Sequence, residues 1–325
     1  MADAGCKLYR HYRHMAFMGF AAVLHNFGAI RRNFRIAKEA LLEEEPDALI
    51  LVDYPSFNLR IASFCHTYLP LTRIFYYIPP KVWAWKSWRI HRIARLCDEV
   101  LGIFPFEPDY YARKGYRCTY VGNPTVEEIS KAASQEQKEK IIALLPGSRE
   151  SEVRHCLPTM LKAARHFPDY SIVVTAAPGL ADALYTPYLR EGEQLTRDTY
   201  AVVQKAEAAI VNSGTATLET ALLDCPQVAV YHLACSRLIA LIRWLQPVVF
   251  SIPYFTLVNI LAGKEVIKEC VANDFKEKKI VAEMQRLLTD EDYKKNMLAA
   301  YEHVRFLLGT QSASKTAALR ITSRL

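Results

Sequence analysis

The chain has 325 residues, of which 51% are hydrophobic and 23% are charged, and this composition excludes disordered, collagen-like and low-complexity proteins. A chain of this length exceeds what one hydrophobic core usually serves, so we expect two domains. The formal net charge of +7 favours anionic partners such as nucleotides, phosphorylated substrates or an acidic lipid surface.

Near the N-terminus, apolar residues recur at helical spacing. They are Phe17, Phe20, Val23, Leu24, Phe27 and Ile30, and Arg31, Arg32 and Arg35 follow directly. An amphipathic helix with basic flanks can lie in an acidic membrane interface, although periodicity alone favours the alternative, a helix that faces the protein core. Because the arginines interrupt the apolar stretch, we do not expect it to span a membrane.

Short apolar runs alternate with helical patterns along the rest of the chain. The predicted strands comprise residues 48–53, 74–78, 100–104 and 119–121, then 141–145, 171–175, 208–211 and 227–230. Continuous apolar strands separated by helices predict parallel sheets covered on both faces. No clear strand is predicted between residues 178 and 200, and residues 292–325 are helical in character.

The two halves meet in residues 122–140, where an apolar strand gives way to a polar, helix-like stretch. We expect a first domain over residues 1–122, a second over 123–300 and a C-terminal helix over 301–325. Parallel α/β domains bind ligands at the carboxyl ends of their strands, so the residues that follow each strand are the candidates for chemistry.

In the first half, Asp53 follows a strand and is a candidate general base. An aspartate that only binds the N–H groups of its own turn is equally common. Trp83 and Trp85 stand in the loop after the next strand, flanked by lysines. They form either a packing plug or the wall of a ligand site, and the sequence leaves both alternatives open.

In the second half, Gly147, Ser148 and Arg149 lie between a strand and a helix predicted to begin near Glu152. A glycine permits close approach of a ligand, the helix N-terminus offers free N–H groups, and the arginine adds a cation suited to phosphate. An ordinary turn with a solvated arginine is an equal alternative.

The segment 212–219 follows another strand and opens a helix with small residues. Ser213 or Thr215 could simply cap that helix. Alternatively, a diphosphate lies on the helix N-terminus, and Glu219 accepts hydrogen bonds from ribose hydroxyls. Neither phosphate candidate matches a Walker A loop or a GxGxxG motif, which disfavours kinases and hydride-transfer enzymes.

Two further patterns bear on cofactors and partners. The eight cysteines are scattered without a CxxC pair or metal-ligand spacing, which indicates reduced cytosolic thiols. The basic residues are dispersed rather than gathered in a stripe, which argues against nucleic-acid binding.

The segments VDYPSFN, IPPKVWAWKSWR, PFEPDYY, VGNP, LLPGSRESEV, NSGTATLE and LVNILAGKEVIKE occur in the order and spacing seen in bacterial lipid-A-disaccharide synthases. This resemblance extends from about residue 5 to at least residue 279. It implies a GT-B glycosyltransferase with two Rossmann-like, doubly wound domains that face a cleft. Such an enzyme joins UDP-2,3-diacylglucosamine to 2,3-diacylglucosamine 1-phosphate with inversion, giving the β(1→6) lipid A disaccharide and UDP, and it requires no metal or other cofactor.

The resemblance also implies roles for the candidate residues. Asp53 would take the proton of the acceptor's 6-hydroxyl, and Arg149 would stabilise the departing diphosphate. The expected donor-site residues are Gly147, Ser148, Arg149, Ser213, Gly214, Thr215, Glu219 and Asn259.

Because both substrates would be acylated, the resemblance favours the membrane interpretation of the N-terminal helix. The expected contacts are Phe17, Phe20, Val23, Leu24, Phe27, Arg31 and Arg32. We then expect a peripheral protein on the cytoplasmic face of the inner membrane. Family analogy also suggests that the C-terminal helix returns to the first domain or is exchanged between the subunits of a homodimer.

One departure from the family pattern concerns the start of the chain. The chain opens on a segment that resembles an internal family segment, so we expect that roughly 40 residues, somewhat more than a strand–loop–helix unit, are absent before it. We therefore expect an incomplete first domain with exposed apolar sheet surface. Two alternatives remain: an impaired nucleotide-binding remnant, and another UDP-N-acetylglucosamine enzyme of the GT-B class, such as the cell-wall transferase or the 2-epimerase.

Overall fold

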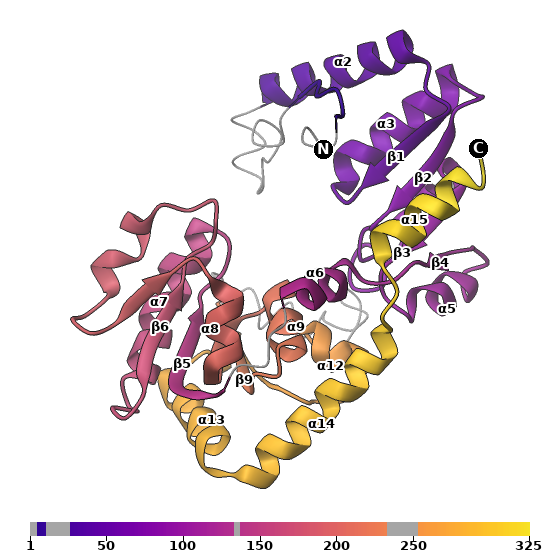
Figure 1. Ribbon diagram of the computed structural model, residues 1–325. Helices are drawn as coiled ribbons and strands as arrows, with labels where there is room; N and C mark the ends of the chain where they lie inside the picture. Colours follow the sequence, from indigo (N-terminus) through magenta and orange to yellow (C-terminus); the bar gives the residue numbers. More distant parts are fainter. Residues whose placement is uncertain (1–4, 11–26, 133–136, 233–252) are drawn as a thin grey trace. The chain divides into compact units, whose positions relative to one another are not determined.

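The computed structural model describes residues 5–10, 27–132, 137–232 and 253–325. The chain forms two compact units: unit 1 comprises Met1–Val121 with Ser314–Leu325, and unit 2 comprises Gly122–Ala313 (Figure 1). Each unit contains one sheet, and every strand pair described is parallel. The predicted α/β class with parallel sheets is confirmed.

Unit 1 is built on a four-stranded sheet of order β1-β2-β3-β4. Its elements are α2 (Phe27–Glu44), β1 (Ala48–Val52), α3 (Pro55–Tyr68), β2 (Arg73–Tyr77), α4 (Arg89–Leu96), β3 (Glu99–Gly102), α5 (Glu107–Ala112), β4 (Thr119–Tyr120) and α15 (Ala313–Thr322). The four strands predicted for the first half are therefore present.

The two faces of this sheet are covered by different parts of the chain. Because side chains alternate along a strand, Ile74 and Tyr76 of β2 point to one face and Phe75 to the other. Ile74 and Tyr76 are buried with residues of α2, α3 and α4. On the opposite face, Ile50 and Val52 of β1 are 47% and 49% exposed. Apolar side chains of β1 thus remain open to solvent on that face.

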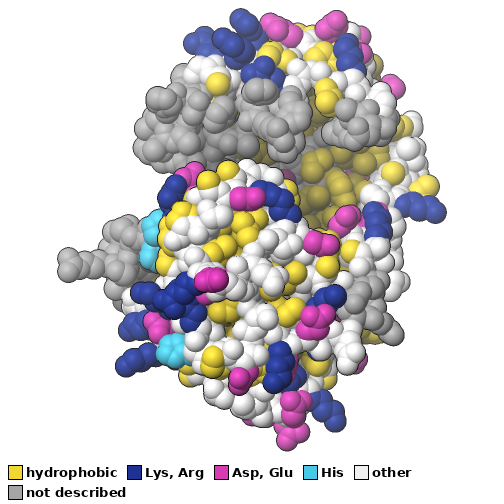
Figure 2. Space-filling view, turned by 60° about the vertical axis from the view of Figure 1, so that its left-hand side comes forward, with side chains coloured by type: hydrophobic (Ala, Val, Ile, Leu, Met, Phe, Trp, Pro, Cys, Tyr) yellow, Lys and Arg dark blue, Asp and Glu magenta, His cyan; other side chains and the backbone are white. Residues whose placement is uncertain are grey.

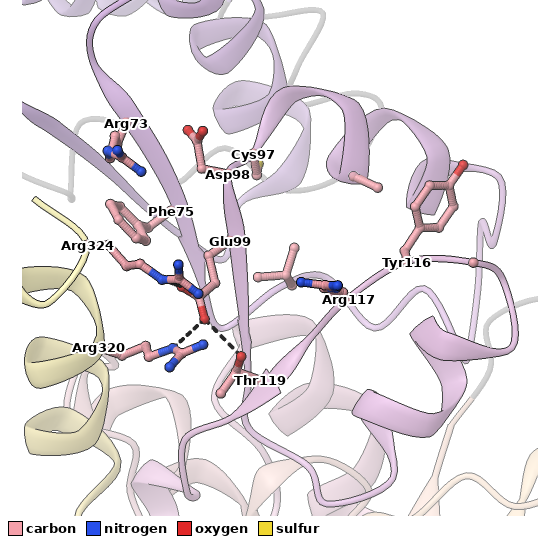
Figure 3. Close-up of a pocket in the computed structure, with 13 residues that line it drawn as sticks. Arg73, Phe75, Cys97, Asp98, Glu99, Tyr116, Arg117, Thr119, Arg320 and Arg324 are labelled. Carbon is pink, nitrogen blue, oxygen red and sulfur yellow. Dashed lines mark hydrogen bonds and ion pairs between the residues drawn. The ribbon is translucent and has the colours of Figure 1, made fainter.

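Helix α15 covers the rest of that second face. Its Ala317 and Ile321 pack against Phe75, Leu101 and Val121. Beside this contact, Arg320 Nε lies 2.6 Å from Glu99 Oε1, and the hydroxyl of Thr119 donates to the same oxygen at 2.9 Å (Figure 3). The C-terminal helix therefore belongs to unit 1.

Unit 2 is built on a six-stranded sheet of order β10-β9-β8-β5-β6-β7. Its strands are β5 (Glu139–Leu145), β6 (Ser171–Thr175), β7 (Gln194–Thr196), β8 (Ala206–Asn212), β9 (Gln227–Tyr231) and β10 (Lys268–Val271). Its α-helices are α6 (Pro124–Ala132), α7 (Glu150–Ala164), α8 (Thr199–Lys205), α9 (Thr215–Leu222), α12 (Leu257–Ala262), α13 (Glu277–Thr289) and α14 (Glu291–Leu308). Short 3₁₀ segments cover Asp182–Leu184, Thr186–Tyr188 and Ala272–Asp274.

Two edge strands of unit 2 were not predicted. β7 lies in the region where the sequence predicts no strand, and β10 pairs with β9 at the opposite edge. Both are short and carry polar residues, because an edge strand needs less apolar surface than a central one. The central strands are more buried: in β8 every residue but Glu207 is buried, and in β5 the last four residues are, and the apolar runs of both strands predict them.

No helix among the described residues is long and apolar enough to cross a membrane.

The packing of α15 predicts that Ile321→Ala lowers the free energy of unfolding by about 2 kcal/mol, because a buried isoleucine leaves a cavity. Leu319→Ala on the same helix is the control, since Leu319 is 61% exposed. Urea unfolding followed by circular dichroism measures both. Equal losses for the two variants would contradict the placement of α15.

Candidate active site

The loop after β1 presents Asp53 at the carboxyl edge of the unit 1 sheet. Its carboxylate is exposed and forms no hydrogen bond or ion pair with the described residues. Its main chain is fixed: Asn58 Nδ2 and the Tyr76 hydroxyl each donate to the Asp53 carbonyl at 2.7 Å. The structure therefore holds the backbone of this aspartate and leaves its carboxylate available to a ligand.

The backbone of this loop is strained. Asp53 and Tyr54 have φ values of 44° and 39°, a left-handed conformation that residues with a side chain rarely adopt. Tyr76 is buried, and burial raises the pKa of its phenol, so it stays a neutral donor to the Asp53 carbonyl. A strained turn held by a buried hydrogen bond is a common feature of functional loops.

The tryptophans after β2 have different roles. Trp83 is 3% exposed, packs edge-on against Phe104 and Phe106, and donates from Nε1 to Glu107 at 3.0 Å. Trp85 is 53% exposed. The first is a packing plug, and the second is an exposed indole with Lys86 Nζ 4.5 Å from its ring centroid.

Glu107 fixes the loop after β3. Its carboxylate is buried and accepts the N–H groups of Ile103 and Phe104 at 2.8 and 3.0 Å. Burial raises the pKa of the Glu107 carboxyl. The hydrogen bonds from the two N–H groups and from Trp83 oppose this rise. A Cβ on Gly102 would come within 2.7 Å of this carboxylate, so the glycine is required for the close approach.

In unit 2, the loop after β5 is held by Glu152. The Ser148 and Arg149 N–H groups donate to Glu152 Oε2 at 3.1 and 3.2 Å. Gly147 has a φ of 116°, and a Cβ there would lie 2.5 Å from Glu152 Oε2 and 2.7 Å from Asn212 Nδ2. The glycine is therefore needed both for its conformation and for the space it leaves.

Arg149 occupies the N-cap of α7, which begins at Glu150. Its Nη1 lies 2.6 Å from Glu152 Oε1, and its side chain is 55% exposed. A guanidinium carries five N–H donors, so this ion pair leaves others for a phosphate. The pair orients the arginine and does not bury it.

The loop after β8 leads into α9 without a side-chain cap. Gly214 stands at the N-cap and makes no side-chain hydrogen bond, and Gly214 and Thr215 are exposed. Capping by Ser213 or Thr215, the simpler alternative, is therefore wrong. Among the described residues, one side-chain hydroxyl of this turn forms a hydrogen bond: that of Thr217 donates to the Gly214 carbonyl at 2.9 Å.

Glu219 lies one turn into α9 and is partly buried. Its carboxylate makes no hydrogen bond or ion pair with any residue that the structure describes. Burial raises the pKa of its carboxyl. An unpaired acceptor near an open helix N-terminus suits hydroxyl donors.

Asn259 requires a correction. Its side chain is fully buried in α12: Oδ1 accepts from the N–H groups of Val266 and Ile267, and Nδ2 donates to the Ile267 carbonyl and to Glu269. All the hydrogen-bonding groups of the amide are used inside the protein, so the side chain has none left to bind a donor substrate. Asn259 instead holds together the segment around α12.

The residues that position these loops were not assigned roles from the sequence. They are Asn58, Tyr76, Glu107, Glu152 and Glu269. All but Tyr76 lie inside the family motifs quoted above, and this position in a motif is the sequence feature that could have pointed to them. Their roles depend on the partners that the fold brings to them.

The predicted membrane residues are described only in part. Phe17, Phe20, Val23 and Leu24, and the side chain of Phe27, lie outside the described residues. Arg31 and Arg32 are exposed on α2. Among the described residues, no group of three His, Cys, Asp or Glu side chains is placed to hold a metal ion.

The fold places this chain in a structural class. It is similar to a UDP-N-acetylglucosamine 2-epimerase from Neisseria meningitidis solved with UDP-N-acetylglucosamine, with a TM-score of 0.61 and 11% identity over 95% of this chain and 83% of that chain. It is also similar to the glycotransferase of kitacinnamycin, with a TM-score of 0.59 and 11% identity over 98% and 87%. At this identity the likeness shows a shared fold, that of the GT-B glycosyltransferases and epimerases.

The sequence comparison narrows that class. The family model described as lipid-A-disaccharide synthetase matches residues 1–321. The chain is 34% identical to the lipid-A-disaccharide synthase of Trichlorobacter lovleyi over 97% of its own length and 85% of that protein. It is 33% identical to the enzyme of the same name from Myxococcus xanthus over 98% and 86%. The chain belongs to the lipid-A-disaccharide synthase family and is a glycosyltransferase, and neither alternative, the remnant or the epimerase-like enzyme, is favoured.

The geometry around Gly147 predicts that Gly147→Ala lowers the free energy of unfolding by about 2 kcal/mol, since alanine is strained at this φ and its methyl group collides with Glu152. Gly179→Ala is the control, because a Cβ at Gly179 meets no atom within 4 Å. Thermal unfolding of both variants measures the effect. A wild-type melting temperature for Gly147→Ala would show that the loop relaxes freely.

Proposed function

We propose that this chain transfers 2,3-diacylglucosamine from UDP to the 6-hydroxyl of 2,3-diacylglucosamine 1-phosphate, forming the β(1→6) lipid A disaccharide and UDP. The observation that carries this proposal is the family match over residues 1–321, which spans both units. The reaction exchanges one C–O bond for another with inversion at the anomeric carbon. It needs a base for the acceptor hydroxyl and positive groups for the departing diphosphate.

The donor would be held by unit 2. The exposed first turn of α9, with Ser213, Gly214 and Thr215, offers N–H groups to the diphosphate, and Arg149 offers guanidinium donors. Glu219 would accept hydrogen bonds from the ribose. Gly147 and Ser148 would act through their backbone, and Asn259 through the segment that it holds. These groups bind the diphosphate without a metal ion, and a metal-free reaction is part of the proposal.

Asp53 of unit 1 would take the proton of the acceptor's 6-hydroxyl as that oxygen attacks the anomeric carbon. The bond from this carbon to the diphosphate oxygen breaks, and UDP leaves with the electron pair. The support for this role is the exposed carboxylate of Asp53, which has no described partner and stands on a fixed backbone.

We further propose that α2 binds an acidic membrane surface, where both acylated substrates reside, on the cytoplasmic face of the inner membrane. Arg31, Arg32 and Arg35 are exposed, and with Lys38 and Phe64 they line a groove along the helix. Lys and Arg side chains gather along the top of unit 1 in Figure 2, the level at which α2 lies in Figure 1. A homodimer remains the proposal for assembly, and it needs no exchange of α15, which packs on unit 1 of its own chain.

The base is tested with Asp53→Asn, which keeps the shape of the side chain and removes the proton acceptor. We expect kcat to fall about 100-fold or more, with the KM of the donor unchanged. Asp47→Asn, an exposed aspartate just before the same strand, is the control. Formation of disaccharide and UDP from the two acylated sugars is the measurement, and normal turnover by Asp53→Asn would rule out the role.

Membrane binding is tested by sedimentation with vesicles that contain phosphatidylglycerol. Reversing two charges, Arg31→Glu with Arg32→Glu, should weaken binding about 30-fold or more, because each basic residue contributes about 1 kcal/mol near an anionic surface. Ser substitutions of Phe17, Phe20 and Phe27 should weaken it as well. Lys278→Glu with Lys295→Glu reverses two exposed charges of unit 2 and should have no effect. Equal binding by all variants would contradict the proposal.

A further inference from the structure

The last residues of the motif IPPKVWAWKSWR, 87–89, have no role in the proposed function. The first tryptophan of the motif, Trp83, is a buried plug, whereas Trp88 is 65% exposed and Arg89 begins α4. Packing of the core therefore does not account for the residues Ser-Trp-Arg that close the motif.

Trp88 and Arg89 line a cavity of about 300 Å³ between α3 and α4, within unit 1. Pro55 and Ser56 of the first turn of α3 form one side, with Arg60, and Trp88, Arg89 and Arg92 form the other. The lining contains three arginines and no carboxylate. Its formal charge is therefore strongly positive.

The charges of the three arginines are not compensated within the described residues. The Arg89 guanidinium forms no hydrogen bond or ion pair there. The Arg60 guanidinium lies over the Phe34 ring, 5.6 Å from its centroid, and Arg92 Nη2 donates to the Leu59 carbonyl at 3.2 Å. Among the residues that the structure describes, none of the three contacts a carboxylate.

Their position along the helices adds to this charge. The first turns of α3 and α4 carry no acidic residue, although the positive end of a helix dipole favours one. Arg89 instead places a cation at the first position of α4. Such an arrangement is electrostatically unfavourable by itself, and an anion in the cavity would relieve it.

The cavity and Asp53 share the same loop. Pro55 and Ser56 directly follow Asp53 and Tyr54 in the chain. The loop that carries the proposed base therefore continues directly into the wall of the cavity.

We propose that this cavity binds the phosphate group of the acceptor; the inference rests on the proposed function. In a hexose 1-phosphate, the phosphate on C1 and the hydroxymethyl group on C5 are carried by the two carbons that flank the ring oxygen, so the phosphate and the 6-hydroxyl are separate groups a few ångströms apart on the same edge of the ring. Arginines that hold the phosphate would leave the 6-hydroxyl free to approach Asp53, and the exposed Trp88 indole would contact the sugar ring. Arg60, Arg89 and Arg92 are then specificity residues that select a phosphorylated acceptor.

The test compares two acceptors, 2,3-diacylglucosamine 1-phosphate and 2,3-diacylglucosamine, in steady-state kinetics with wild-type protein and Arg89→Ala. The Arg89 guanidinium has no described internal partner, so its loss should leave the fold intact. We expect the KM of the phosphorylated acceptor to rise about tenfold, corresponding to one charge-assisted hydrogen bond. The KM of the other acceptor and that of the donor should stay unchanged. Arg95→Ala, an exposed arginine of the same helix outside the cavity, is the matched control.

A second measurement separates the substrate phosphate from a lipid headgroup. Water-soluble glucosamine 1-phosphate should bind wild-type protein more tightly than glucosamine in calorimetry, and Arg89→Ala should lose this difference while it keeps wild-type binding to phosphatidylglycerol vesicles. An equal rise in KM for both acceptors, or loss of vesicle binding alone, would overturn the proposal. If wild-type protein makes no disaccharide from either acceptor, the proposed function fails, and the calorimetry with glucosamine 1-phosphate still decides whether the cavity binds phosphate.

Discussion

Both sheets are parallel throughout the described residues, and this constraint decides where the chemistry lies. Parallel strands need a crossover after each strand, so all their carboxyl ends meet at one edge of the sheet. In unit 2 the neighbouring strands β5 and β8 bring the Gly147 loop against Asn212, which opens the Gly214 loop. In unit 1 the same rule places the loops after β1 and β2 side by side, where Asp53 meets Tyr76.

Loops at such an edge need their backbone groups satisfied, and here carboxylates supply the acceptors. Glu107 binds two N–H groups after β3, Glu152 binds two after β5, and Glu269 of β10 binds those of Phe255 and Thr256. A carboxylate is acceptor-only when ionised and takes several N–H bonds at once. Each glutamate therefore fixes a loop without a long element of its own, and the side chains that face a ligand remain free.

The sheet of unit 1 is completed from both ends of the chain. Its first face is covered by the helices that follow its own strands, but its second face receives α15, which comes after the whole of unit 2. The contact joins an apolar pair, Ala317 and Ile321, to an ion pair between Arg320 and Glu99. The packing of unit 1 therefore includes residues from the end of the chain. A substitution in α15 alters contacts with the same sheet that carries Asp53.

The sequence by itself determined the α/β class, the central strands and the family, because buried parallel strands are continuous apolar runs and because the motifs keep their order and spacing. It missed β7 and β10, whose short polar strands carry no such pattern. Only the tertiary structure decided what individual side chains do. It used every polar group of Asn259 inside its own segment, left the start of α9 without a cap, and gathered Arg60, Arg89 and Arg92 around one cavity. The physical reason is that hydrogen bonds and charges act over a few ångströms in space, and their partners here come from separate elements of the chain.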